Sequence, residues 1–577
     1  NSSMVLLPEV PMKARLFDPR VGYFTVGYTD FDSNPQGIEY KKLITRWCLE
    51  PKNEAAYLRG ELVEPKKPIT IYIDPATPKK WVPYLIQGVN DWQVAFEKAG
   101  FKNAIYALEA PTDDPSWSLE DARHSAIVYK PSDIPNASGP HINDPRTGEI
   151  LETHINWYHN VMSLLRDWYM IQAGTIDEAA RKMQLDDELM GQLIRFVSSH
   201  EVGHTLGLRH NFGSSHTVPV EKLRDKAWVE ANGHTPSIMD YARFNYVAQP
   251  EDGITRAGIF PRIGIYDKWS IEWGYRWLPQ FQTPEDEVAF SNQSIIKKLK
   301  TDVRYTFGTE SDPNDPRNQS EDLGDDSMLA SLYGIKNLKR IVPQILTWSY
   351  EPNKSYAGAG EIYSGVVSQF NRYLGHVTKN VAGIYSNSIT VEQTDEIARE
   401  FVPANIQKRA IAFLNEQLFT TPEWLIDRQL MEKAKILPVN VICSLQSGVL
   451  ARLINKNTLD KMSENEILNG KKAYTSAQMF NDLKKVIWSN LGQSDIYKRN
   501  MQKAYVENLI NMLDKKGNAD KNASGKHPAY SEAPAIAHGQ LTELKRLTTS
   551  AASMTSGTAK GHYQNLITLI DTALSNK

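Results

Sequence analysis

The N-terminal residues alternate hydrophobic and polar positions in short runs that are typical of β-strands. Two runs, at 22–31 and 41–50, are rich in aromatic and β-branched residues, and the turn cluster DSNPQG separates them. A third, β-branched run occupies residues 69–73 between prolines. We therefore expect a β-rich segment over residues 1–67 and the first strand of a new unit directly after it.

The pattern then takes a helical period before strands return. Leu85, Val89, Trp92 and Phe96 follow one another at intervals of four and three, which predicts one apolar helix face, and Gly100 can end that helix. This order predicts an α+β unit built on a mixed sheet. The strand patterns that follow occupy residues 104–110, 125–131 and 149–160.

A helix beginning near residue 185 is expected to carry the candidate chemistry, in the stretch SSHEVGHTLGLRHNFGSSH. His200 and His204 are four residues apart, so both can bind one ion from the same helix face. Glu201 would reach over the open side of that ion, where a carboxylate can hydrogen-bond a water rather than coordinate. Gly207 can adopt the left-handed conformation that turns the chain and brings His210 to the ion. Three imidazoles leave one position open, the catalytic arrangement for zinc.

Two other features of this half receive no catalytic role. His216, the fourth histidine of the stretch, is expected in a solvated loop. Residues 310–327 carry seven carboxylates against the single Arg317, and their spacing matches no calcium loop that we can name. We expect a solvated or helix-capping loop there.

The chain from about residue 281 has a mainly helical pattern. The sequence TTPEWLIDRQL predicts a helix with a threonine cap and Pro422 at its first position, and no repeat of fixed length is present. We expect three parts: the β-rich segment at 1–67, a catalytic unit at 68–280 and a mainly α-helical domain at 281–577. Shared helix faces are expected for Ile411, Leu414 and Leu418, for Met479, Leu483, Val486 and Ile487, and for Tyr505, Leu509, Met512 and Leu513.

Composition excludes some classes of partner. The net charge of −3 gives no sign of nucleic-acid binding. No apolar run approaches the roughly 20 residues of a membrane span, and no signal-peptide pattern is visible. Cys48 and Cys443 cannot form a disulfide scaffold, and neither has the spacing of a zinc ligand.

The eleven-residue motif HExxHxxGxxH resembles the signature of the metzincin clan of zinc peptidases at every defined position. The downstream SIMDY resembles the clan's methionine turn. The resemblance implies one catalytic Zn²⁺ on His200, His204 and His210, with Met239 as a soft hydrophobic floor beneath them. Tyr241 matches the tyrosine that some members place on the metal or the oxyanion, although a buried phenol would give the same pattern.

The resemblance implies a metzincin-like α+β fold, with a twisted mixed sheet and a zinc-site helix, and peptide hydrolysis. Zinc lowers the pKa of a bound water to about 7, and Glu201 would take the proton as the water attacks a carbonyl. Residues 151–158, LETHINWY, resemble the clan's edge strand, which pairs with an extended substrate. The expected substrate is an unfolded or looped segment of protein.

Three longer stretches resemble a large family of bacterial secreted or outer-membrane zinc metalloproteases of mostly undefined function. They are SIMDYARFNYVAQPEDG, IGIYDKWSIEWGY and EDLGDDSMLASLYGIKNLKRI. This resemblance implies an exported protein, whether periplasmic, attached to the outer membrane or secreted. Two other functions stay open: a zinc hydrolase of a non-protein substrate, and a zinc-fold scaffold without turnover, against which the intact Glu201 argues.

Overall fold

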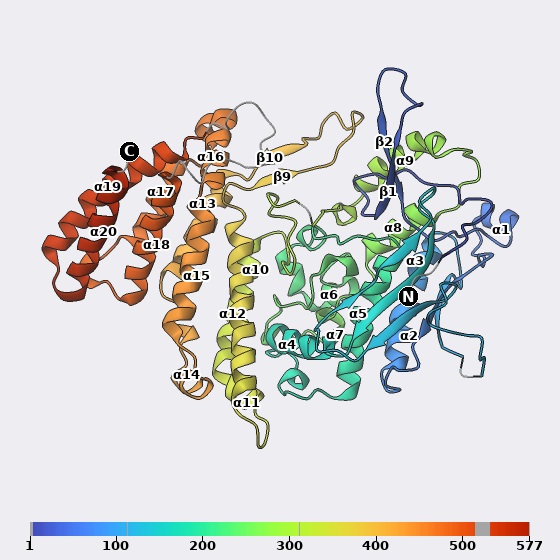
Figure 1. The fold of residues 1–577 in the computed structure, drawn as a ribbon, viewed down its shortest axis with the longest axis horizontal. Coiled ribbons are helices and arrows are strands. Elements are labelled where there is room, and N and C mark those ends of the chain that lie inside the picture. The colour runs from blue at the N-terminus through green and yellow to red at the C-terminus, as the bar shows by residue number, and fades with distance from the viewer. Residues whose placement is uncertain (1–3, 112, 311, 514–530, 576–577) are drawn as a thin grey trace.

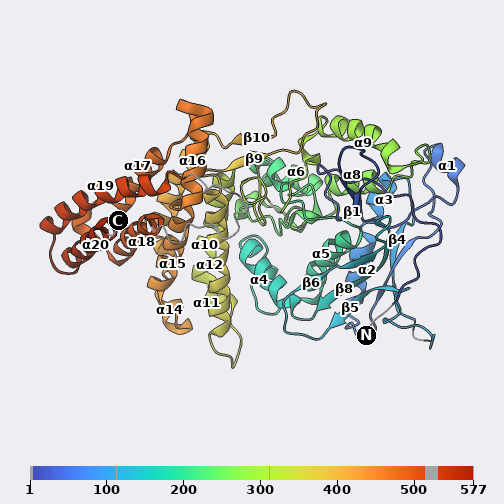
Figure 2. The ribbon, with the colours of Figure 1, turned by 45° about the horizontal axis from the view of Figure 1, so that its top comes forward.

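The computed structural model describes residues 4–111, 113–310, 312–513 and 531–575. The chain forms a mixed α/β half that contains the sheet and a second half built almost entirely of helices (Figure 1). Each half has its own cluster of buried apolar residues. Figure 2 shows the same division from another direction, with the C-terminal helices at one end of the long axis. The expected mixed sheet in the N-terminal half and the helical C-terminal region are confirmed.

The N-terminal segment contains the expected hairpin. Strands β1 (Thr25–Asp30) and β2 (Glu39–Ile44) pair antiparallel across the predicted turn. A short helix, α1 (Glu54–Leu58), leads to the main sheet. Lys41 joins the hairpin to a later helix, because its ammonium contacts both Asp30, at 3.0 Å, and Glu285, at 2.8 Å.

The main sheet has the strand order β4-β3-β5-β8-β6, and β7 also pairs with β8. Neighbours among β4, β3, β5 and β8 run parallel, whereas β6 and β7 run antiparallel to β8. The helix expected before β4 is present as two pieces, and Gly100 ends the second piece with a φ of +93°. The strands of the sheet are β3 (Ile69–Ile73), β4 (Ile105–Glu109), β5 (Ser125–Lys130), β6 (Ala137–Ser138), β7 (His141–Asn143) and β8 (Ile150–Tyr158), and the two helix pieces are α2 (Val82–Asn90) and α3 (Gln93–Lys98).

The prediction that residues 151–158 form an edge strand of the sheet is wrong. Residues 151–158 lie in β8, which has β5 on one side and the short strands β6 and β7 on the other. The chain between β5 and β8 folds back and covers β8, a long-range event that the local pattern does not reveal. The exposed edge therefore belongs to the segment around β6.

Two helices place the candidate site. Helix α4 (Val161–Ala173), which was not predicted, follows β8. Helix α5 (Asp187–Thr205) is the expected histidine helix, with two acidic residues in its first turn. The α5 helix packs against α2, where the Ser198 hydroxyl donates to the Leu85 carbonyl and the Trp92 indole donates to the Ser199 carbonyl. The elements after it are α6 (Lys226–Asn232), α7 (Arg256–Ile259) and α8 (Ile265–Tyr275).

The second half confirms the three predicted apolar faces, since all the residues named for them are buried except the half-buried Val486 and Leu513.

The predicted helix start at Pro422 is wrong. Only a three-residue 3₁₀ turn (Glu423–Leu425) forms there, and α14 begins after Asp427, whose side chain caps it. The elements are α9 (Pro284–Leu299), α10 (Ser327–Ile341), α11 (Ile345–Trp348), α12 (Ala357–Thr378), β9 (Ile384–Ser386), β10 (Arg399–Phe401), α13 (Ala404–Leu414), α14 (Arg428–Ala434), α15 (Pro438–Leu453), α16 (Lys456–Asn469), α17 (Ser476–Ile487), α18 (Ile496–Leu513), α19 (Ala533–Met554) and α20 (Gly557–Ser575).

The two halves share core residues. Val218, Val220 and Tyr246 precede the predicted boundary near residue 280, yet they belong to the apolar cluster of the C-terminal helices. The amide of Asn337, in α10, donates to the carbonyls of Tyr246 and Ala248. The domain boundary near residue 280 stays a prediction.

Among the described residues no single helix is long and apolar enough to cross a membrane. Only α14 and α15 taken together, a pair bent by 103°, reach the length and the apolar composition of a span.

Candidate metal centre

The first two histidines are oriented by backbone carbonyls. His200 and His204 lie one turn apart on α5, and each donates from Nδ1 to a carbonyl oxygen, that of Ile238 for His200 and that of Leu208 for His204, both at 2.9 Å. These bonds fix the ring tautomer, because a carbonyl can only accept. The Nε2 atoms are thereby left as acceptors, and that of His200 is buried without a hydrogen-bond partner.

A glycine turn brings in the third histidine. Gly207 has a φ of +88°, and the N–H of the next residue, Leu208, folds back and donates to the Gly203 carbonyl at the end of α5. The Nε2 atom of His210 then lies 3.1 Å from that of His204. One ligand nitrogen from each of the three histidines lies within 4.8 Å of the others. This separation suits three imidazoles around one ion, with Zn–N bonds of about 2.1 Å.

Burial keeps the three imidazoles in the metal-binding form. It lowers the pKa of His204 to about 3 and that of His210 to about 4, with help from neighbouring positive charge, and it lowers the pKa of His200 well below its ordinary value. Neutral imidazole is the form that binds zinc. The donor set, its tautomers and the unpartnered Nε2 atom therefore all fit a zinc ion.

The methionine turn lies directly beneath the histidine helix. Met239 is fully buried, and a Cβ on Gly203 would overlap its sulfur, so glycine at this position of α5 permits the contact. Asp267, in α8, holds the turn: it accepts the Ser237 hydroxyl at 2.6 Å and the Ile238 N–H at 2.8 Å. The role of Asp267 could not be predicted from sequence, because Ser237 and Ile238 lie about thirty residues before it and no motif links them.

Comparison with known families adds independent support. A family model described as Met-zincin matches residues 182–495, which is more than half of the chain. The chain belongs to the Met-zincin family. A second family model, a domain of unknown function, matches residues 1–52. No curated protein and no solved structure matches the chain.

The Met-zincin match includes every residue of the histidine triad and the methionine turn, and it extends to residue 495, through most of the helical half. The strands β3 to β8 precede the matched region. The region that defines the family therefore contains both the metal centre and the helices α10 to α17.

Glu201 lies next to His200 on α5 and is almost fully buried. Burial raises the pKa of its carboxyl to about 8, while a hydrogen bond from the Gly139 N–H lowers it. Gly139 directly follows β6, and a Cβ there would overlap the Glu201 carbonyl oxygen, so only glycine allows this close approach. The exposed edge of the sheet and the carboxylate of this Met-zincin are thus in direct contact.

Tyr241 lies in the site rather than in the core. It follows the methionine turn in the left-handed conformation, with a φ of +62°, and it is half-buried. Its ring centroid is 5.2 Å from that of His200 and 4.8 Å from that of His210. The Arg243 guanidinium also lies over this ring, 4.5 Å from its centroid. His216 does not join the triad. Contrary to the expected solvated loop, it is half-buried in a 3₁₀ turn (Ser215–Thr217).

A cavity of about 40 Å³ opens beside Glu201. Trp168 of α4 forms part of its wall, and the Arg243 guanidinium stacks on that indole at 3.0 Å from the ring centroid. Glu321 binds Arg243 at 2.6 Å, so the positive charge is paired. Trp168 and Arg243 were missed because only the fold brings them to the histidines. The other lining residues are Asn136, Ala137, Val161, Leu164, Phe196, Val197, His200 and Tyr241.

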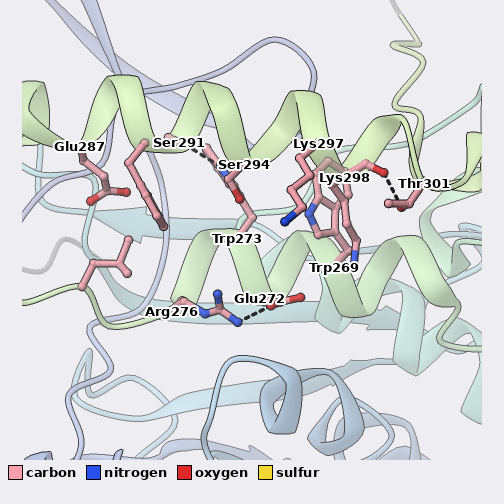
Figure 3. A pocket seen from close by; sticks show the side chains of 12 residues that line it. Trp269, Glu272, Trp273, Arg276, Glu287, Ser291, Ser294, Lys297, Lys298 and Thr301 are labelled. Carbon is pink, nitrogen blue, oxygen red and sulfur yellow. Dashed lines mark hydrogen bonds and ion pairs between the residues drawn. The ribbon is translucent and has the colours of Figure 1, made fainter. Parts of the chain in front are cut away.

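Another cavity, of about 210 Å³, lies between α8 and α9 (Figure 3). Trp269 projects from α8 toward Lys297 of α9, and the Trp273 indole donates to the Ser291 hydroxyl of α9 at 2.9 Å. Arg276 pairs with Glu272 along α8. No member of the triad lines this cavity, and neither does Glu201 or Tyr241. It is separate from the metal centre.

Proposed function

We propose that the protein is a zinc-dependent endopeptidase that uses Glu201 as its general base. The observation that carries the proposal is the convergence of three neutral imidazoles with the buried Glu201 carboxyl beside them. A zinc ion bound to the triad would activate a water molecule and polarise a substrate carbonyl. The family match supports a zinc metallopeptidase.

Glu201 supplies the proton transfer. Its carboxylate accepts the proton of the attacking water and returns it to the nitrogen of the leaving amine. The Gly139 N–H holds the carboxylate in place. The surrounding apolar wall from Val161, Leu164 and Phe196 excludes bulk water, which strengthens electrostatic interactions within the site.

Tyr241 stabilises the oxyanion. Its ring lies against both His200 and His210 and lines the cavity beside Glu201, where its hydroxyl would reach a substrate oxygen. A phenol donates a hydrogen bond without the charge cost of a lysine or arginine.

The substrate binds as an extended strand along β6. Among the described strands β6 pairs only with β8, so its other edge offers backbone groups to a peptide. The segment leads directly to Gly139 and Glu201. A folded protein would have to present a loop or an unfolded segment to bind there.

The test is cleavage by zinc-quantified protein beside its Glu201→Ala variant, on unfolded casein and on a diverse peptide library, with products identified by mass spectrometry. We expect internal cuts from the wild type and none from the variant at equal zinc content. Equal cuts from both proteins, or none from the zinc-loaded wild type on any substrate, would contradict the proposal.

A further inference from the structure

The guanidinium of Arg243 is held firmly in the wall of the cavity beside Glu201. Its Nε donates to the Glu321 carboxylate at 2.6 Å. It also lies over two rings, 3.0 Å from the centroid of Trp168 and 4.5 Å from that of Tyr241. The Arg243 side chain is only 10% exposed. These contacts leave the guanidinium little freedom to turn away from the cavity.

The outer end of this guanidinium has no protein partner. Within the described residues Nη1 and Nη2 of Arg243 make no hydrogen bond, and neither nitrogen is fully buried. Arg243 lines the cavity together with Glu201, yet these two side chains form no ion pair in the described part of the chain. The two terminal nitrogens are therefore open to a ligand that enters the cavity.

Glu321 does not balance the charge of Arg243 alone. The same carboxylate pairs with Arg372 of α12, at 3.4 Å, so one negative charge faces two guanidiniums. Gln172 also donates to Glu321, at 3.1 Å, but its amide carries no charge. Arginine stays protonated in proteins, so the positive charge beside the cavity is only partly compensated in the free protein.

The backbone that carries Arg243 is unusual as well. Tyr241 and Arg243 both have the left-handed conformation, with φ angles of +62° and +57°. Residues with a Cβ seldom adopt it, and such conformations gather at binding and catalytic sites. The turn after Met239 therefore keeps an unfavourable backbone at the two positions whose side chains line the cavity.

We propose that Arg243 binds the carboxylate of a glutamate or aspartate in the peptide substrate and so determines the substrate class. The outer end of a guanidinium matches a carboxylate, and the two form parallel, charge-assisted hydrogen bonds. The apolar side chains of Val161 and Leu164 line the same cavity, and a low local dielectric strengthens such a pair. This inference rests on the proposed function, because it names the peptides that the same site would cut.

The recognised residue lies close to the bond that is cut. The Tyr241 ring contacts the Arg243 guanidinium and also the rings of His200 and His210, at centroid distances of 5.2 and 4.8 Å. Successive residues of an extended peptide are about 3.4 Å apart. An acidic residue within about three positions of the cleaved bond can therefore reach Arg243.

The test measures peptide binding to the full chain, zinc-loaded and carrying Glu201→Gln so that no peptide is consumed. The probes are labelled decapeptides of alanine and glycine with blocked ends, in which one position is Glu, Gln, Lys or Phe and that position is scanned. Kd is read by fluorescence anisotropy. The same set is then measured with Arg243→Gln and with Arg243→Lys added, and zinc content and Tm are recorded for each protein.

Arg224→Gln is the matched control. The Arg224 guanidinium also lies over a ring, 4.5 Å from the centroid of Tyr333, and pairs with Asp252 at 2.6 Å, but it does not line the cavity beside Glu201. This variant therefore loses a stacked and paired arginine without changing the cavity.

We expect the best Glu peptide to bind at least about tenfold more tightly than its Gln counterpart, the effect of a charge-assisted pair. Arg243→Gln should bring this ratio to about one, and Arg224→Gln should leave it unchanged. If Arg243→Gln does not fold, Arg243→Lys keeps a charge for Glu321 without the two-pronged end and should still lower the ratio. A merely structural role would weaken all peptides alike and leave the ratio as it is.

Equal binding of Glu and Gln peptides would overturn the proposal, and so would a preference that survives Arg243→Gln. Tighter binding of peptides with a free C-terminus than of any blocked Glu peptide would overturn it as well. These results are separate from cleavage. Wild type that cuts peptides without preference for acidic residues contradicts the role of Arg243 alone, whereas a Glu preference in binding without any cleavage contradicts the peptidase proposal alone.

Discussion

The candidate chemistry depends on single residues whose partners are backbone groups. His200 and His204 are oriented by the carbonyls of Ile238 and Leu208, and Glu201 is held by the N–H of Gly139. Backbone partners do not rotate or titrate, so the rings and the carboxylate keep their orientation before any ligand binds. Such prior organisation is what electrostatic catalysis requires.

Replacing the phenol of the site tests its proposed role at this scale. Tyr241→Phe removes only the hydroxyl, and we expect kcat for peptide cleavage to fall about 100-fold, the effect of losing one oxyanion donor, with little change in KM. Zinc content should stay at the wild-type value. Tyr305→Phe is the control and should be fully active, because the Tyr305 ring packs against Trp269 of α8 and does not line the cavity beside Glu201. An unchanged kcat in Tyr241→Phe would leave the tyrosine as a packing residue.

A buried histidine outside the triad gives a defined pH dependence. Burial lowers the pKa of His234 to about 4, while its Nε2 donates to the Arg243 carbonyl at 3.0 Å. The unfolded chain binds a proton at His234 below about pH 6.5, whereas the folded chain does so only near pH 4. Stability from this group is therefore lost as the pH falls through that window, by about 1.4 kcal/mol per pH unit.

The measurement compares the wild type with His234→Gln by urea unfolding at pH 7 and pH 5. Relative to the variant, the wild type should lose about 2 kcal/mol of unfolding free energy between those values. The comparison between two proteins cancels the opposite contribution of buried carboxyls with raised pKa, such as that of Asp240. A difference that does not change with pH would show that His234 is not held neutral.

At the scale of elements, the end of the histidine helix depends on one glycine. Gly207 has a φ of +88°, and a Cβ there would overlap the Thr45 carbonyl oxygen. Gly207→Ala should cost at least about 2 kcal/mol of unfolding free energy and reduce zinc binding, because the turn sets the position of His210.

Gly253→Ala is the matched control for this change. Gly253 also has a positive φ, of +63°, but no atom lies within 4 Å of the added Cβ. Only the conformational cost, about 1 kcal/mol, is expected, with full zinc binding. Equal losses in the two variants would mean that the contact with Thr45 does not determine this turn.

Some elements of the fold and the site could be predicted from the sequence, and others could not. Strand β3, the α5 helix and the β1–β2 hairpin follow from local periodicity, and the triad follows from eleven consecutive residues. The β6 edge, Trp168 and Asp267 do not, because each acquires its position from contacts with residues far away in the chain. Pro422 shows the opposite failure, since a good local signal for a helix start gave only a 3₁₀ turn.

At the scale of the molecule, the two halves complete each other's packing. Val218, Val220 and Tyr246 of the first half are buried among the C-terminal helices, and Glu321 pairs with Arg243 beside the site. A fragment of residues 1–280 would expose these apolar side chains to water. We expect it to aggregate or to bind a hydrophobic dye, with no cooperative thermal transition in circular dichroism. A fragment that unfolds cooperatively and binds zinc would contradict this.

The most direct test of the account is a zinc titration of cleavage with two proteins, the wild type and Glu201→Gln. We expect metal-free wild type to be inert and to reach full casein cleavage at one equivalent of Zn²⁺. Glu201→Gln should bind the same single equivalent yet cleave at least about 100-fold more slowly, because the ligands are intact and the general base is absent. Cleavage that does not depend on zinc, or equal rates for the two zinc-loaded proteins, would contradict the account.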